Sequence, residues 1–216
     1  MMKRFGVKTC ITMILLVMCI AGLSVTTYAK TDEYGYDMTG GGYAVTGQLP
    51  GVGYSAALYD ATNGLPTSEA NCILASRDGY IWIGGYSGIM RYDGNVFERI
   101  TSIEGLTSGR AIFEDRTGRI WVATNDNGVV VIDGSESRHY TKADGLPSSS
   151  IRSFAQDSNG IVFIGTTSGI SWVGADMNIY TIDDERVTHE RILNLVTDAA
   201  GDVYGLTKSG AVFSVT

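Results

Sequence analysis

Residues Gly64–Gly94 read GLPTSEANCILASRDGYIWIGGYSGIMRYDG, and the rest of the chain repeats this pattern. A Gly-Leu-Pro turn opens the stretch, and Asp78-Gly79 and Asp93-Gly94 supply residues that hairpin turns favour. Between the turns lie apolar and aromatic runs of about five residues, the ordinary length of a strand, without the i, i+3, i+4 spacing of a helix. This stretch and the residues just after it therefore predict four strands: Asn71–Ser76, Tyr80–Gly84, Gly88–Tyr92 and Val96–Thr101.

The same pattern returns at Gly105, at Gly145 and, in weaker form, near Arg186. The glycines that end the first turn of each unit are 39, 42 and 41 residues apart, at Gly79, Gly118, Gly160 and Gly201. Four short strands in a period of about 40 residues are typical of a β-propeller blade. We therefore predict an all-β fold, a β-propeller of about four four-stranded blades at 64–104, 105–144, 145–185 and 186–216.

Residues 1–29 have the three parts of a secretory signal peptide. Positive charges precede an apolar run, Ile11–Ile20, and Thr27-Tyr28-Ala29 offers small residues for cleavage after Ala29. The alternative is a retained membrane anchor, because Thr9–Val25 just reaches the ~17-residue lower limit for a membrane span. We expect an exported protein on the periplasmic or extracellular face of the cell envelope.

Residues 30–53 are rich in Gly and Tyr, show no sustained period and are predicted to be a flexible lead-in. Tyr54–Asp60 is predicted to be a strand that belongs to another blade, because it occupies the register of a fourth strand before the first Gly-Leu-Pro. Two interpretations remain open. Either this strand completes the last unit and four blades close, or the chain is the front part of a larger propeller, which we favour because terminal repeats usually differ from the others.

The net charge of the chain limits the classes of partner that it is expected to bind. The formal net charge is −7, and residues 30–216 carry 13 basic and 23 acidic residues. A negative surface disfavours nucleic acid and anionic lipid, so we expect membrane contact only through the N-terminal segment or a downstream span. Cys72 is the one cysteine after the signal peptide, and its apolar neighbours predict a buried thiol rather than a nucleophile.

The segments Gly145–Ile170 and Ile81–Gly94 resemble the two-component regulator propeller repeat, through Gly-Leu-Pro, Asp-x-x-Gly, Ile-Trp-Ile-Gly and Gly-Ile-x-Arg-Tyr-Asp-Gly. The resemblance spans Tyr54–Thr216 and implies an extracytoplasmic sensor module of a bacterial membrane receptor. Its output domain, a histidine kinase or a cyclic-dinucleotide enzyme, would lie outside these residues. The resemblance also implies a small-molecule or saccharide ligand and dimerisation within the receptor. The chain departs from the pattern at Thr107 for Pro, Ala123 for Gly and Trp172-Val173-Gly174 for Arg-Tyr-Asp.

Most conspicuous residues have a structural explanation. Trp82 and Trp121 occupy the same strand position in successive blades and are expected in the core between blades. The recurrent Asp residues of the first turns are expected to bond their own backbone. His139 is expected at the surface, and neither it nor His189 has metal-ligating partners at a suitable spacing. We predict no metal site, no cofactor and no catalytic group.

Rigid scaffolds display function on loops, so ligand contact is expected where the second and third strands join and where the first strand begins. The side chains best suited to polar or stacking contact there are Tyr86, Arg110, Asn125, Asp126 and His189.

Three functions are compatible with these observations. The first is the ligand-sensing propeller of a signal-transduction receptor, and the second is a secreted interaction propeller without a signalling role. The third is an enzyme, because propellers with similar repeats include lyases acting on cyclic antibiotics. That chemistry needs convergent His and Glu residues, and His189 has no second His to join it. We therefore expect a binding module.

Overall fold

The computed structural model describes residues 43–45, 56–67 and 69–215. Contacts divide the chain into two compact units, residues 1–59 and residues 60–216. The predicted signal peptide and most of the predicted lead-in lie outside the described residues. In the first unit, β1 (Tyr43–Val45) pairs antiparallel with β2 (Ala56–Leu58).

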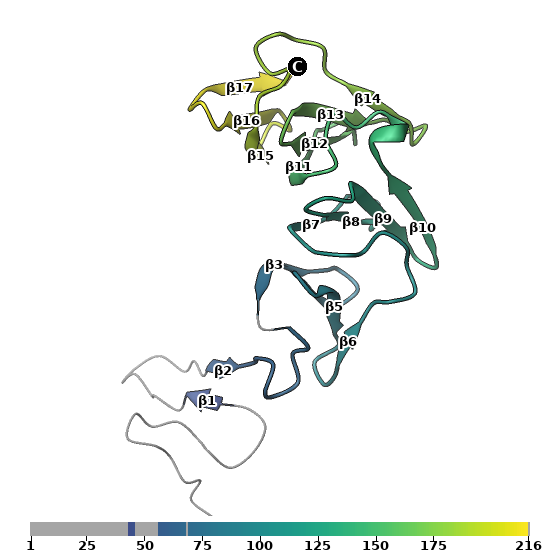
Figure 1. The fold of residues 1–216 in the computed structure, drawn as a ribbon, viewed down its shortest axis with the longest axis vertical. Helices are drawn as coiled ribbons and strands as arrows, with labels where there is room; N and C mark the ends of the chain where they lie inside the picture. Colours follow the sequence, from purple (N-terminus) through teal and green to yellow (C-terminus); the bar gives the residue numbers. More distant parts are fainter. Residues whose placement is uncertain (1–42, 46–55, 68, 216) are drawn as a thin grey trace, which may run out of the picture. The chain divides into compact units, whose positions relative to one another are not determined.

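The second unit contains four consecutive antiparallel sheets (Figure 1). Three of them have four strands each, joined in chain order by hairpins. They consist of β3 (Ala70–Ala75), β4 (Ile81–Gly85), β5 (Gly88–Tyr92) and β6 (Phe97–Arg99); β7 (Ala111–Glu114), β8 (Ile120–Ala123), β9 (Val129–Asp133) and β10 (Glu136–Tyr140); and β11 (Ile151–Gln156), β12 (Val162–Thr166), β13 (Gly169–Val173) and β14 (Ile179–Thr181).

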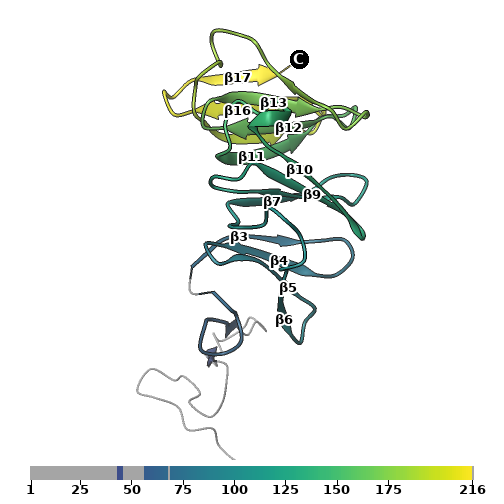
Figure 2. The same cartoon turned by 45° about the vertical axis from the view of Figure 1, so that its right-hand side comes forward.

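The fourth sheet has three strands, β15 (Ile192–Thr197), β16 (Val203–Thr207) and β17 (Val212–Val215). The turned view in Figure 2 shows the four sheets following one another as layers. Each sheet is a propeller blade, so the predicted fold class is confirmed. The segment Tyr54–Asp60, predicted to be a strand of another blade, contains β2, which pairs with β1.

The turn between the first and second strands shows why the repeats fold alike. Its glycines have φ values of 87° to 94°, a left-handed conformation that glycine adopts without the penalty of a side chain. In three blades an Asp side chain accepts backbone N–H groups of its own turn: Asp115 from Thr117 and Arg119, Asp157 from Asn159 and Ile161, and Asp198 from Ala200 and Asp202. The backbone-bonding role predicted for these three residues is confirmed.

The first blade differs from this pattern. Ser76, not Asp78, takes the place of Asp115, because its Oγ accepts the Trp82 Nε1–H at 3.1 Å as Asp115 Oδ2 accepts that of Trp121 at 2.9 Å. Asp78 Oδ1 accepts hydrogen bonds from Ser76 Oγ and from the backbone N–H of Tyr80, the latter at 3.3 Å, so the backbone-bonding role predicted for Asp78 is confirmed as well.

The core lies between the sheets. Trp82 and Ile89 face Val122 and Val130 of the second blade, and Trp121 faces the third. A further cluster joins Phe163 and Ile170 to Ile192, Leu195 and Val203 of the fourth blade. Trp82 and Trp121 are 5% and 0% exposed, which confirms that these rings form the core between blades.

Candidate functional site

The five residues predicted to contact a ligand lie in the expected connections. Tyr86 is in the β4–β5 turn and is 63% exposed, and Asn125 and Asp126 form the β8–β9 turn. Arg110 precedes β7 directly, and His189 lies in the connection to β15. Arg110, Asp126 and His189 are exposed, and Asn125 is half-buried.

Backbone hydrogen bonds tie the blades together at this end of their strands. Gly109 N–H donates to Gly85 O at 2.8 Å, and Ile151 N–H donates to Thr124 O at 3.0 Å. Gly169 N–H donates to Glu190 O at 2.8 Å between the third and fourth blades. The start of each first strand is thus fixed against the preceding blade, which sets where Arg110 and its counterparts emerge.

Tyr86 and Arg110 lie within electrostatic reach of Arg152, a residue that the sequence analysis did not select, and so does Arg191. Arg152 is the second residue of β11, and Arg191 directly precedes β15. Burial, followed by the charges of Arg110 and Arg191, lowers the pKa of Arg152, and Tyr86 opposes this effect. The sequence did contain one signal that Arg152 is equivalent to Arg110. Arg152 follows Arg110 by 42 residues, which is also the spacing between the turn glycines Gly118 and Gly160.

The other predicted residues have different neighbours. Asn125 N–H donates to Ser108 Oγ at 3.2 Å. His189 has φ +68°, and its backbone N lies beside Gly169. Asp126 lies at the exposed tip of the β8–β9 turn. Of the five predicted residues, Tyr86 and Arg110 are therefore the two that lie within electrostatic reach of Arg152.

Nucleophilic or metal chemistry finds little support in the described part of the chain. The Cys72 thiol lies 3.9 Å from Gly84 O, and burial raises its pKa to about 11, so it stays protonated at neutral pH. His139 is half-buried, and its Nε2 lies 2.5 Å from Asn127 O. His139, expected at the surface, is thus partly covered, because its ring contacts Asn127 O in the β8–β9 turn. Among the described residues, no group of three or more His, Cys, Asp or Glu side chains could hold a metal ion.

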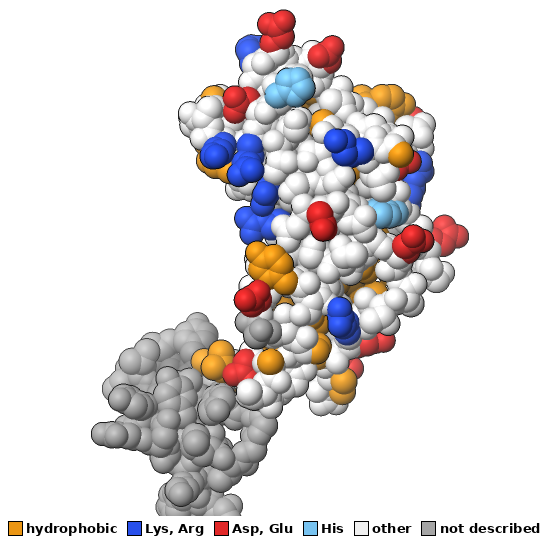
Figure 3. All heavy atoms as spheres, in the orientation of Figure 1, with side chains coloured by type: hydrophobic (Ala, Val, Ile, Leu, Met, Phe, Trp, Pro, Cys, Tyr) orange, Lys and Arg blue, Asp and Glu red, His pale blue; other side chains and the backbone are white. Residues whose placement is uncertain are grey.

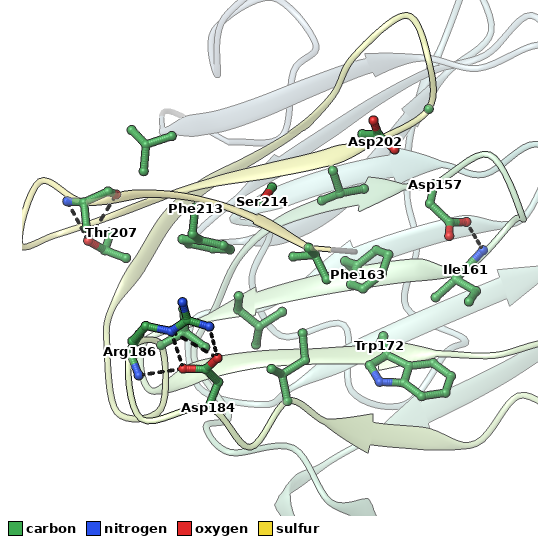
Figure 4. Close-up of a pocket in the computed structure, with 18 of the residues that line it drawn as sticks. Asp157, Ile161, Phe163, Trp172, Asp184, Arg186, Asp202, Thr207, Phe213 and Ser214 are labelled. Carbon is green, nitrogen blue, oxygen red and sulfur yellow. Dashed lines mark hydrogen bonds and ion pairs between the residues drawn. The ribbon is translucent and has the colours of Figure 1, made fainter.

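A hollow between the third and fourth blades lies outside this group of residues (Figure 4). Apolar side chains that line it include Phe163, Trp172 and Phe213. Asp184 pairs with Arg186, whose Nε donates to Asp184 Oδ1 at 2.9 Å, and these hydrogen bonds lower the pKa of Asp184 to about 2. The fourth sheet has three strands, so the outer part of the core between these blades stays uncovered, which accounts for the hollow.

The sheets, their hairpin order and the apolar layers between them define a β-propeller. Three segments, residues 64–87, 107–126 and 145–168, match the model of the two component regulator propeller. In these three segments the chain is similar to the two component regulator propeller. No curated protein matches the chain by sequence.

Solved structures of similar fold include extracellular domains from B. thetaiotaomicron. The domain of the hybrid two component system BT3049 is 22% identical, with a TM-score of 0.64 over 73% of this chain and 23% of that one. The domain of BT4673, a one component system, is 20% identical, with a TM-score of 0.61 over 80% and 24%. This chain thus spans about a quarter of the length of those domains.

Virginiamycin B lyase from Staphylococcus aureus is 14% identical, with a TM-score of 0.56 over 87% of this chain and 68% of that one. At these identities the likenesses establish the propeller fold alone. In the described part of the chain, no helix is both long and apolar enough to cross a membrane.

Proposed function

We propose that this chain is an extracytoplasmic, ligand-binding propeller module of a bacterial signal-transduction receptor, with the output domain outside these 216 residues. The observation that carries the proposal is the match of three blades to the two component regulator propeller. The similar solved domains include extracellular parts of two component systems, which supports the same assignment. The N-terminal signal peptide predicted from the sequence, with cleavage after Ala29, would deliver the propeller to the periplasmic or extracellular side.

The mechanism we propose is a ligand-dependent change in packing between blades. A ligand shifts an equilibrium only by binding one state better than the other. Tyr86, Arg110 and Arg152 come from three successive blades, so a ligand that contacts all three would favour one arrangement of the blades. The hydrogen bonds from Gly109 to Gly85 and from Ile151 to Thr124 lie at the same end and would be affected first. In a receptor dimer this change would pass to the output domain.

We assign no catalytic role to the chain. A secreted interaction propeller and a lyase are the alternatives. The lyase would require acid and base groups that converge, whereas His139 is held by Asn127 O and His189 lies in another blade. The ligand class we propose is a small molecule or saccharide, bound beside Tyr86 and Arg110.

Two measurements test the proposal. In the first, residues 1–216 are fused to a phosphatase that is active only outside the cytoplasm, with a fusion that starts at Lys30 as the matched control. We expect activity only with the N-terminal segment present, and equal inactivity of both fusions would refute export. In the second, thermal unfolding is followed with a panel of saccharides and small metabolites. A ligand at 100 times its Kd stabilises a protein by about 2.7 kcal/mol.

Binding without turnover supports the receptor module. Chemical conversion of a bound compound would instead favour an enzyme, and the absence of any stabilising compound would favour the interaction propeller.

A further inference from the structure

Three arginines from three successive blades gather at one end of the innermost strands. Arg110 directly precedes β7, Arg152 is in β11, and Arg191 directly precedes β15. The strand β11 lies beside both β7 and β15. Lys208, whose backbone N–H donates to Arg191 O at 2.8 Å, adds a fourth positive charge. Figure 3 shows Lys and Arg side chains gathered along one edge of this unit.

The local backbone explains how Arg152 reaches this edge. The ladder between β11 and β12 pairs Ile151 with Thr166 and Ser153 with Gly165, so Arg152 is an extra residue without a partner across the ladder. Such bulges redirect a side chain and are common next to binding sites. Arg110 lies in a similar position at the start of β7. Its backbone N–H donates to the O atom of Ala123, and Ala123 is the ladder partner of Ala111, the next residue.

This cluster is not explained by the stability of the fold. Arg152 Nε is buried and has no hydrogen-bond partner in the structure. Among the described residues, the ion pairs involve other arginines: Arg77, Arg91, Arg119 and Arg186. Glu190, which directly precedes Arg191, accepts a hydrogen bond from Ser209 Oγ at 3.0 Å, and none of the described ion pairs joins it to these arginines. In the described part of the chain, Arg110, Arg152 and Arg191 thus form no ion pair, although the net charge of the chain is −7.

We propose that Arg110, Arg152 and Arg191 form a binding site for the anionic group of a small ligand, a carboxylate or a sulfate or phosphate ester, with the exposed ring of Tyr86 beside the ligand body. The planar guanidinium group offers paired donors that match carboxylate and phosphate oxygens. An aromatic ring at the edge of such a site suits a sugar or another ring-bearing ligand. The inference rests on the proposed ligand-binding function and narrows its ligand class to acidic compounds.

The first test measures binding by calorimetry with glucuronate and glucose 6-phosphate as probes and neutral glucose as the comparison. We expect both acidic probes to bind the chain more tightly than glucose, and their affinity to fall as salt rises to about 0.15 M. Arg152→Gln and Arg191→Gln should each weaken acidic-probe binding by about tenfold, the usual size for a charge-assisted hydrogen bond. Arg99→Gln, which removes an exposed arginine outside the cluster, should change it less than about twofold. Equal binding of acidic probes to wild type and Arg152→Gln, or no binding to wild type, would overturn the proposal.

A second readout needs no sugar. Because Arg152 is partly buried among like charges, Arg152→Gln should leave the melting temperature unchanged or raise it, and inorganic phosphate should stabilise the wild type more than the variant. A structural arginine would behave oppositely, with a lower melting temperature for Arg152→Gln and no phosphate effect in either protein. That result would also overturn the anion site.

Failure of this inference is separable from failure of the proposed function. A neutral saccharide that binds equally to wild type and Arg152→Gln would refute the anion site and leave the receptor module standing. If the chain bound the acidic probes but was not exported, the receptor module would be refuted and the anion site would stand.

Discussion

Asp115 shows how one side chain can hold a whole turn. It is fully buried, and its carboxylate accepts hydrogen bonds from Thr117 Oγ1 at 2.7 Å, Trp121 Nε1 at 2.9 Å and Arg119 Nε at 2.6 Å. Burial alone would raise the pKa of Asp115, but the hydrogen bonds from Thr117, Trp121 and Arg119 outweigh it and keep the pKa below its usual value. The charged form is therefore the one that the fold stabilises.

We predict that Asp115→Asn lowers the free energy of unfolding by about 3 kcal/mol at neutral pH, because an amide group would face donors with its own N–H groups. The pKa of Asp115 is lower in the folded state than in the unfolded state, where it is about 3.9. Its contribution is therefore present above pH 4 and is lost as pH falls through the folded pKa. Urea unfolding of wild type and variant should thus give a difference that shrinks below about pH 4.

The matched control is Asp198→Asn, which changes the equivalent but exposed residue of the fourth blade. It should cost less than about 1 kcal/mol. A difference for Asp115→Asn that stays constant as the pH falls would contradict the role assigned to the charged form.

At the scale of the element, glycines make a close approach between the first two blades. A Cβ on Gly109 would lie 2.4 Å from Gly84 Cα, and one on Gly84 would lie 2.5 Å from Cys72 Sγ. Both contacts are shorter than any that real side chains make, and the first is to backbone, which cannot rotate away. The Gly109 N–H to Gly85 O hydrogen bond depends on this approach.

Gly109→Ala should therefore push β4 and the start of β7 apart and lower the free energy of unfolding by about 2 kcal/mol. The change can be measured by chemical denaturation. Ala70 is the comparison, because Ala70 opposes Gly85 at the start of the first blade, is exposed and already carries a Cβ. Ala70→Gly should cost at most about 1 kcal/mol. Equal stability of wild type and Gly109→Ala would show that the two blades separate at no cost.

The elements themselves follow from local signals in the sequence. Turn residues and short apolar runs recur at a period of about 40 residues, so the strands of all four blades, the turn glycines and the buried tryptophans could be predicted. The strand β1 could not, because three residues in a Gly-rich segment form a strand only through their pairing with β2. The partial burial of His139 was also not predicted, since it depends on a contact with Asn127 O in the β8–β9 turn.

The candidate site was predicted less completely for the same physical reason. Tyr86 and Arg110 could be selected, because their loops are recognisable from turn chemistry alone. Arg152 sits inside a strand pattern and reaches the site through a bulge, and a bulge depends on the register between two strands. Arg191 joins the group only because β11 and β15 are neighbours in space. Convergence of residues some 40 positions apart is a property of the assembled blades.

At the scale of the whole molecule, equivalent cross-strand pairs in the first and second strands of each blade show which blade surfaces are buried by the next blade. The pairs Leu74–Trp82, Phe113–Trp121 and Ala155–Phe163 face the following blade, and Phe163 is 7% exposed. The corresponding pair in the fourth blade is Val196–Tyr204, of which Val196 is 52% and Tyr204 is 37% exposed. The fourth blade thus presents an apolar surface of the kind that other blades bury.

This difference predicts that removing the aromatic ring lowers the free energy of unfolding by different amounts in the two blades. Phe163→Ala removes a ring from the core between the third and fourth blades and should cost about 3 to 5 kcal/mol. Tyr204→Ala removes a partly exposed ring and should cost less than about 1 kcal/mol. Chemical denaturation of both variants at several protein concentrations makes the comparison. If Tyr204→Ala cost as much as Phe163→Ala, the surface of the fourth blade would be covered in solution. A cost that rose with protein concentration would then identify a second copy of the chain as the cover, because only an association depends on concentration.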